Sequence, residues 1–356
     1  MPLDEALGIT PYQQHSEEVI RLGCLFSLVM PYELASWMLS QGSGLSVSAA
    51  SLWNWVQQRG QQLQATVMAQ LQAQAADGVV APEPLTESLA NLPLAIGADG
   101  VMVPFRPTPK TSQGKTRWRE VKVGILARLG TRLTRAQETV PQLLHRRLVA
   151  VLGDIDEFLP HLQLEARRQA FETAPWVIWL SDGGRGFWRV YRTGFRHCAV
   201  AVLDFFHAAG HLARATQALF GEKRSAPART WFRRWRHLLR HGRTRDVLRS
   251  LTVLVNSGLF TGQALDTLIQ VQAYFQRHYH HMQYQQFDQQ QIPLGSGMVE
   301  SACKWLIQQR FKGVGMRWSE DGFNHLLRLR LAWVNQRFEP LFPQVPDPPK
   351  IYSPDR

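Results

Sequence analysis

Three acidic residues, Asp99, Asp182 and Glu300, stand at positions in the sequence that suit metal-assisted chemistry. Asp99 directly follows the apolar run 94–98, and Asp182 follows the run 176–181. Each run has the length and apolar content of a buried strand, so we expect each aspartate to emerge near a strand end. Glu300 instead opens an amphipathic stretch that predicts a helix. Two strand-end aspartates and one helical glutamate predict a shared carboxylate site.

Carboxylate oxygens suit a hard cation such as Mg²⁺ or Mn²⁺. Two such ions about 3.5–4 Å apart can stabilise the attacking and leaving oxygens of an in-line displacement at phosphorus. We therefore expect two Mg²⁺ (or Mn²⁺) ions held by Asp99, Asp182 and Glu300. Glycines beside the aspartates are expected to leave room for a bulky substrate backbone. The turns after Glu300 carry three cations that suit phosphates: Lys304, Arg310 and Lys312.

Other acids and histidines compete for roles at this site. Asp204 also ends an apolar run and is the strongest rival ligand, whereas Asp154 precedes a predicted helix that it can cap. His207 and His211 share one helical face, but a zinc site needs further ligands that the sequence does not supply. We expect His207 to hydrogen-bond a metal-binding carboxylate or to touch the substrate strand.

The central part of the chain predicts a sheet. Hydrophobic runs at 95–105, 118–129 and 147–152 favour three consecutive strands, and 155–173 has helical spacing. Further strands are expected at 176–180 and 198–203. Three strands, a helix, a strand and a last strand after a short crossover is the order of an RNase H-like core. The predicted fold class is α/β, with this mixed-sheet core, an α-helical insertion and an N-terminal helical region.

The N-terminal region has the outline of a helix-turn-helix. A helix over 32–39, a Gly-Ser-Gly turn and a second helix that starts at 49 and stops near Gly60 predict DNA binding, although an ordinary helical hairpin has the same outline. The predicted domains are a helix-turn-helix at 1–76, a linker at 77–93, the first part of the core at 94–204, a basic helical insertion at 205–291, the last core helices at 292–340 and a Pro-rich tail at 341–356.

The charge of the chain points to a polyanionic partner. Forty Lys and Arg residues against 28 Asp and Glu residues give a net charge of +12. No run approaches the length of a membrane span, Asp4 and Glu5 disfavour a signal peptide, and three scattered cysteines form no disulfide framework. These features predict a cytoplasmic, nucleoid-associated protein that binds DNA and not a membrane.

The densest basic tract lies in the predicted insertion. Trp231 and Trp235 interleave with its arginines at helical spacing. A solvated helix face is the ordinary alternative, but few acids stand nearby to neutralise the tract, which favours a nucleic-acid groove. The predicted DNA contacts here are Arg233, Arg234, Arg236 and Arg240.

Several phrases of the sequence resemble a known family. They are Leu-Ser-Asp-Gly-Gly-Arg-Gly-Phe-Trp at 180–188, Leu-Asp-Phe-Phe-His-Ala-Ala-Gly-His-Leu at 203–212, and Gly-Ser-Gly-Met-Val-Glu-Ser-Ala-Cys-Lys at 295–304, continuing to Arg-Phe-Lys-Gly-Val-Gly-Met-Arg-Trp at 310–318. Over residues 3–340 the chain resembles insertion-sequence transposases of the ISKra family in the DDE superfamily. The resemblance implies Asp99, Asp182 and Glu300 as the catalytic triad. Asp204 and His207 also match the Asp-x-x-His motif of Mutator-type enzymes.

The resemblance implies a Mg²⁺-dependent DNA transposase that binds the ends of an insertion sequence, cuts them and joins them to target DNA, as a homo-oligomer on DNA. An RNase H-like nuclease without strand transfer is the alternative enzyme, and a transposase-derived DNA-binding protein is the non-enzymatic alternative. Relatives usually carry a cysteine-rich segment ahead of the equivalent of Pro2. This chain begins without one, a departure that bears on autonomous transposition and not on the core.

Overall fold

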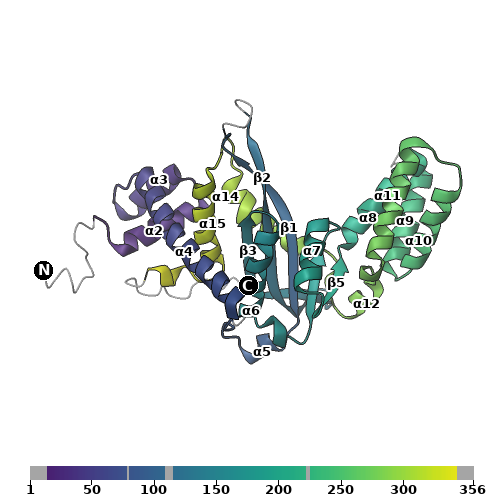
Figure 1. The fold of residues 1–356 in the computed structure, drawn as a ribbon, viewed down its shortest axis with the longest axis horizontal. Coiled ribbons are helices and arrows are strands. Elements are labelled where there is room, and N and C mark those ends of the chain that lie inside the picture. The colour runs from purple at the N-terminus through teal and green to yellow at the C-terminus, as the bar shows by residue number, and fades with distance from the viewer. Residues whose placement is uncertain (1–13, 78–79, 109–114, 222–224, 343–356) are drawn as a thin grey trace.

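The computed structural model describes residues 14–77, 80–108, 115–221 and 225–342. A central sheet separates two helical regions, with the N-terminal helices on one side and the helical insertion on the other (Figure 1). None of the helices within these ranges is long and apolar enough to cross a membrane. The tail predicted at 341–356 falls outside the described residues from 343 onward, and so do residues 1–13 of the N-terminal region.

The sheet has five strands in the order β3-β2-β1-β4-β5. They are β1 (Leu94–Phe105), β2 (Arg117–Leu133), β3 (Thr139–Leu152), β4 (Val177–Ser181) and β5 (Ala199–Leu203). The first three pair antiparallel, whereas β4 pairs parallel with β1 and β5 parallel with β4. The predicted mixed α/β fold with an RNase H-like strand order is therefore confirmed by the sheet itself.

Two neighbouring residues of β2 show how the sheet is covered on both faces. A Cβ at Gly124 would meet Leu162 and Phe158 of α6 (Ile155–Arg168), so α6 packs closely on that face. Ile125, the next residue, points to the other face, because successive strand residues alternate. Its side chain lies there beside Gly97, its partner on β1. The helix that carries Glu300 lies on this second face. Between β4 and β5 the chain forms α7 (Arg185–Gly194).

The N-terminal region contains α2 (Glu17–Val29), α3 (Tyr32–Ser43) and α4 (Ala49–Asp77). The two helices and the turn between α3 and α4 occur as predicted, but the expected stop near Gly60 is wrong. At Gly60 a Cβ would lie 2.5 Å from the backbone and side chain of His325, so the missing side chain lets α15 (Glu320–Val334) approach α4 closely. Tertiary packing therefore outweighs the low helix propensity of glycine.

The insertion consists of helices that leave the sheet after β5. They are α8 (Phe205–Phe220), α9 (Ala226–Arg240), α10 (Thr244–Asn256), α11 (Gly262–His278) and α12 (Tyr284–Gln289). The chain then returns to the sheet and forms α13 (Gly297–Ala302), a π-helical segment (Cys303–Gln308), α14 (Gln309–Phe311) and α15. The π-helical segment begins three residues after Glu300, a predicted site residue. This rare geometry occurs frequently at functional sites.

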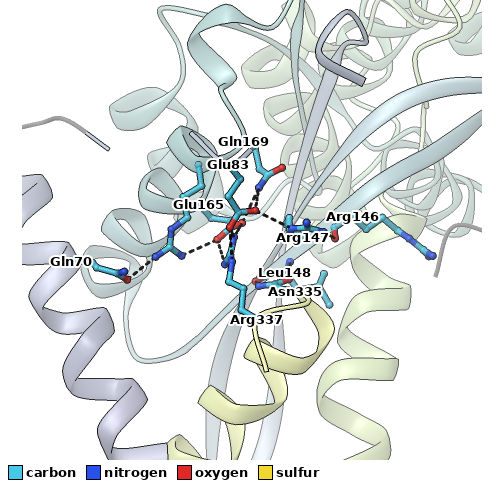
Figure 2. A network of polar contacts seen from close by, with 10 residues as sticks. Gln70, Glu83, Arg146, Arg147, Leu148, Glu165, Gln169, Asn335 and Arg337 are labelled. Carbon is cyan, nitrogen blue, oxygen red and sulfur yellow. Dashed lines mark hydrogen bonds and ion pairs between the residues drawn. The ribbon is translucent and has the colours of Figure 1, made fainter. Parts of the chain in front are cut away.

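A partly buried ion-pair network joins α6 of the core to the linker before β1 and to the segment after α15 (Figure 2). Arg337, which follows α15, binds both carboxylate oxygens of Glu165 at 2.7 and 2.8 Å and also Glu83 at 2.6 Å. Glu165 lies on α6 and is only 3% exposed. Glu83 belongs to the predicted linker, which also contains α5 (Glu87–Ala90). This part of the linker is therefore fixed against the core.

Candidate active site

Asp99 and Asp182 are brought together by the parallel pairing of β1 and β4. The last pair in the register joins Ala98 to Ser181, so the two aspartates are the next residues along both strands. Asp182 emerges at a strand end as predicted. Asp99 does not, because β1 continues for six more residues to Phe105, paired with β2 after its pairing with β4 has ended at Ala98. Asp99 stands in the middle of a long strand, beside the point where its parallel neighbour stops.

The helix that carries Glu300 can approach this part of β1 because Gly97 has no side chain. A Cβ at Gly97 would lie 2.7 Å from the Cε of Met298 and 3.4 Å from Val299. Met298 and Val299 are buried, whereas Glu300, the next residue of α13, is exposed. The absent side chain thus allows α13 to lie directly against β1, two residues from Asp99. The expectation that Gly97 leaves room for a substrate backbone is wrong, because α13 occupies that space.

The electrostatics show that the carboxylates share one environment. Burial raises the pKa of Asp99, and the charges of Asp182 and Glu300 raise it further. A hydrogen bond from the backbone N–H of Gly100 and the charge of His207 oppose this rise. Burial also raises the pKa of Cys303 to about 12, with contributions from the charges of Asp99 and Glu300. Negative charge is therefore concentrated around a half-buried aspartate.

The donor set fits Mg²⁺ in its chemistry. One oxygen of Asp99 accepts a hydrogen bond from the N–H of Gly100 at 2.7 Å, and one of Asp182 accepts from Gly184 at 2.9 Å. The second oxygen of each has no hydrogen-bond partner among the described residues, and neither does the carboxylate of Glu300. Within those residues no three His, Cys, Asp or Glu side chains form a ready-made metal cage. Mg²⁺ commonly uses one or two carboxylates together with waters and substrate phosphates.

A second glycine beside the site accommodates an aromatic ring of the insertion. A Cβ at Gly183 would lie 2.2 Å from the ring of Tyr274 on α11, so this glycine too faces protein and not open space. Tyr274 stacks on His211 with ring centroids 3.5 Å apart. Its hydroxyl is buried and has no partner among the described residues. Sequence analysis missed Tyr274, because nothing in its helical context indicates that α11 folds back onto the Asp182 loop.

Asp204 differs from the other acids in its surroundings. It is 1% exposed and caps α8, accepting a hydrogen bond from the N–H of His207 at 2.8 Å. Its other oxygen accepts from the N–H and the hydroxyl of Ser296. Both oxygens are therefore engaged, which disfavours Asp204 as a rival metal ligand.

His207 stands in the first turn of α8 with its side chain exposed. It lies close enough to Asp99 for its charge to lower the pKa of that carboxyl. We expect His207→Ala to slow catalysis by roughly 10- to 100-fold, the usual effect of removing a group that supports a metal ligand. Cleavage rates at saturating DNA, with thermal unfolding as the control for folding, measure this. Wild-type rates in the variant would leave His207 without a role in the reaction.

The three cationic residues that follow Glu300 differ in exposure and in their contacts. Lys304 and Lys312 are exposed, and the ammonium group of Lys312 lies 5.6 Å from the centre of the Trp118 ring. Arg310 is only 2% exposed, and its Nε donates to the carbonyl of Ser27 at 2.9 Å. Its guanidinium also packs over an aromatic ring on each side. The prediction that Arg310 contacts DNA is therefore wrong, since its fork joins α2 to the C-terminal helices.

The basic tract of the insertion is exposed on α9, where Arg233 and Arg236 share a basic face and Arg234 lies on another side. Arg233, Arg234 and Arg236 are exposed, while Arg240 pairs with Asp288 at 2.8 Å. The guanidinium of Arg236 lies 5.1 Å from the centre of the Phe205 ring, the residue after Asp204. The C-terminal part of the tract therefore lies against the start of α8, where the insertion leaves the sheet. A shallow pocket follows this face and is lined by Phe232, Arg233, Arg236, His237, Arg240 and His241.

The predicted helix-turn-helix has little positive charge. Residues 1–77 contain two arginines and no lysine, against six acidic residues. Arg21 pairs with Glu18 and Glu339, and Arg59 pairs with Glu17. Both arginines of the described part of this region are therefore paired with carboxylates, and neither is free to contact a phosphate. DNA binding by the helix-turn-helix stays a prediction that these charges do not favour.

Comparison with known proteins gives little further information. No family model matches the chain, and no curated protein matches it. Among solved structures, one described as the Drosophila P element transposase strand transfer complex aligns over 96% of both chains, with 11% sequence identity and a TM-score of 0.40. A likeness this weak establishes no relationship. The resemblance to the ISKra family stays a prediction from the sequence motifs.

Proposed function

We propose that the chain is a metal-dependent DNA transposase that cleaves the ends of a DNA element and transfers them to target DNA. The observation that supports this most directly is that the charges of Asp182 and Glu300 both raise the pKa of Asp99, which lies on the central strand of an RNase H-like sheet. The exposed arginines of α9, which packs against the start of α8, offer contacts for the DNA backbone.

The residues of the chain divide the work of such a reaction. Asp99, Asp182 and Glu300 would hold Mg²⁺, which when bound activates the attacking oxygen and stabilises the leaving oxygen. Lys304 and Lys312 are exposed, follow Glu300 closely along the sequence and suit contacts with phosphates. The arginines of α9 hold the DNA backbone in register, which is the usual role of phosphate contacts.

A nuclease without strand transfer would use the same carboxylates, so the products must separate the two functions. The experiment incubates the protein and Mg²⁺ with a labelled duplex from the DNA that flanks the gene, pre-cleaved to expose a 3′-hydroxyl, and with a plasmid target. Joined products that contain the label support the transposase. Hydrolysis without joining favours the nuclease, and specific binding without either product favours the DNA-binding alternative.

The basic face of α9 predicts a change in salt dependence. Replacing Arg233, Arg234 and Arg236 with glutamine should weaken binding to duplex DNA and reduce the slope of log affinity against log salt by up to about 0.9 for each arginine–phosphate interaction that the replacement removes. Fluorescence anisotropy over a range of salt concentrations measures this slope.

A matched triple replacement provides the control. Arg132 and Arg135 are exposed beyond the pairing of Leu94 with Arg128, and Arg146 is exposed at the bulge of β3 next to that pairing, so all three lie near the opposite end of the sheet. Their replacement with glutamine should leave the slope almost unchanged. Equal changes in both variants would indicate that general charge, and not the face of α9, sets the affinity.

A further inference from the structure

Asp204 lies at the point where the chain leaves the sheet for the insertion, and Ser296 lies where it returns. The carboxylate of Asp204 accepts two hydrogen bonds from Ser296, at 2.5 Å from its N–H and at 2.6 Å from its hydroxyl. Beside this pair, the N–H of Phe205 donates to the carbonyl of Leu294 at 2.8 Å. Asp204 and Ser296 are 1% and 3% exposed. The base of the insertion is thus closed by buried polar contacts.

The same two residues also connect with the predicted metal ligands. The N–H of Asp204 donates to the carbonyl of Ser181 at 3.0 Å, directly before Asp182. The carbonyl of Ser296 accepts from the N–H of Glu300 at 3.2 Å, one helical turn along α13. One continuous set of hydrogen bonds therefore runs from the end of β4 through Asp204 to the helix that carries Glu300.

The helix α13 needs such support from outside. It has only six residues and passes directly into a π-helical segment, and a helix this short is not stable alone. The hydroxyl of Ser296 makes no capping bond within α13, because it donates to Asp204 instead. The packing of Met298 and Val299 at Gly97 and the bonds of Ser296 to Asp204 both contribute to the position of α13.

We propose that Asp204 is a positioning residue, which places Glu300 relative to Asp182 by holding Ser296, and that it is not a metal ligand. Both its oxygens are engaged by N–H and O–H donors, and the described residues provide no cation paired with it. The consequence for catalysis rests on the proposed function, whereas the support of α13 does not.

Cys303 provides a readout that does not depend on activity. It directly follows α13 and is 4% exposed, whereas Cys24 on α2 is fully buried elsewhere and serves as an internal reference. Asp204→Asn keeps the acceptor for His207 but replaces the acceptor for Ser296 with an amide donor. We expect N-ethylmaleimide to modify Cys303 about 10- to 100-fold faster in this variant, the change in local opening that loss of a charge-assisted hydrogen bond produces. The rate at Cys24 should not change.

Ser296→Ala gives a graded second test, because it removes the hydroxyl bond and keeps the N–H bond. Its Cys303 rate should lie between those of the wild type and Asp204→Asn, and cleavage of end DNA should fall in the same order. Asp266→Asn removes an exposed carboxylate of α11 and should match the wild type in both thiol rates.

Three results would overturn the proposal. Lost cleavage with an unchanged Cys303 rate would mean that Asp204 acts on the reacting groups directly. Faster modification of both cysteines would mean general destabilisation, and a faster Cys303 rate with full cleavage would mean that Asp204 does not position Glu300. A wild-type protein without cleavage activity would overturn the proposed function instead, and the thiol rates would still decide whether Asp204 holds α13.

Discussion

Replacing Asp182 with asparagine should abolish cleavage while leaving DNA binding nearly intact. The substitution removes a negative oxygen that suits a metal ion but keeps the acceptor for the N–H of Gly184, so the loop retains its shape. A loss of at least about 10²- to 10³-fold is expected, the scale of removing one group that stabilises charge in a transition state. Single-turnover cleavage and anisotropy with the same labelled duplex measure the two properties in parallel.

Asp156→Asn is the matched control for this experiment. Asp156 is an exposed acid in the first turn of α6, and its only ion pair among the described residues is with the exposed Arg189. Its replacement should alter neither cleavage nor binding. If Asp182→Asn lost binding as severely as cleavage, the residue would be structural and the assignment of the site would have to change.

Replacing Arg337 with alanine should destabilise the fold by about 3–5 kcal/mol, the usual effect of breaking a buried ion pair by removing one partner. Glu165 would remain buried with Arg168 as its nearest remaining cation, at 3.3 Å. The loss should lie at the lower end of the range because Arg168 remains. Urea unfolding measures the free energy of unfolding. Arg189→Ala, which breaks an exposed pair, should cost less than about 1 kcal/mol.

The same network predicts a pH dependence. Burial by itself would raise the pKa of Glu165, but hydrogen bonds and charge from Arg337, with a smaller contribution from Arg168, hold it below its ordinary value of 4.5. A carboxyl whose pKa is lower in the folded state stabilises the fold above its unfolded pKa and loses this contribution as the pH falls through the folded value. The stability difference between wild type and Arg337→Ala should therefore shrink below about pH 4.5. A constant difference down to acid pH would contradict this.

Much of the sheet and of the candidate site follows from sequence alone. Runs of buried residues end at Ser181 and Leu203, where β4 and β5 end, because a strand buried on both faces needs continuous apolar residues. The order of the strands follows in turn, since short hairpins and two helical crossovers leave few arrangements. Asp182 and Glu300 can be predicted because each is an acid beside an apolar run. A charged group costs free energy there unless a partner or a metal compensates for it.

The tertiary structure decided what local patterns cannot encode. In a sequence, a glycine indicates the end of a helix or space for another molecule. In the structure, α15 packs against the backbone at Gly60, and α13 packs against it at Gly97. Arg310 has the sequence context of a phosphate contact, but it is buried between α2 and the C-terminal helices, where its Nε donates to the carbonyl of Ser27. Asp204 and Ser296 are separated by the whole insertion. Contacts across such separations depend on how elements pack in space, and local periodicity carries no information about that packing.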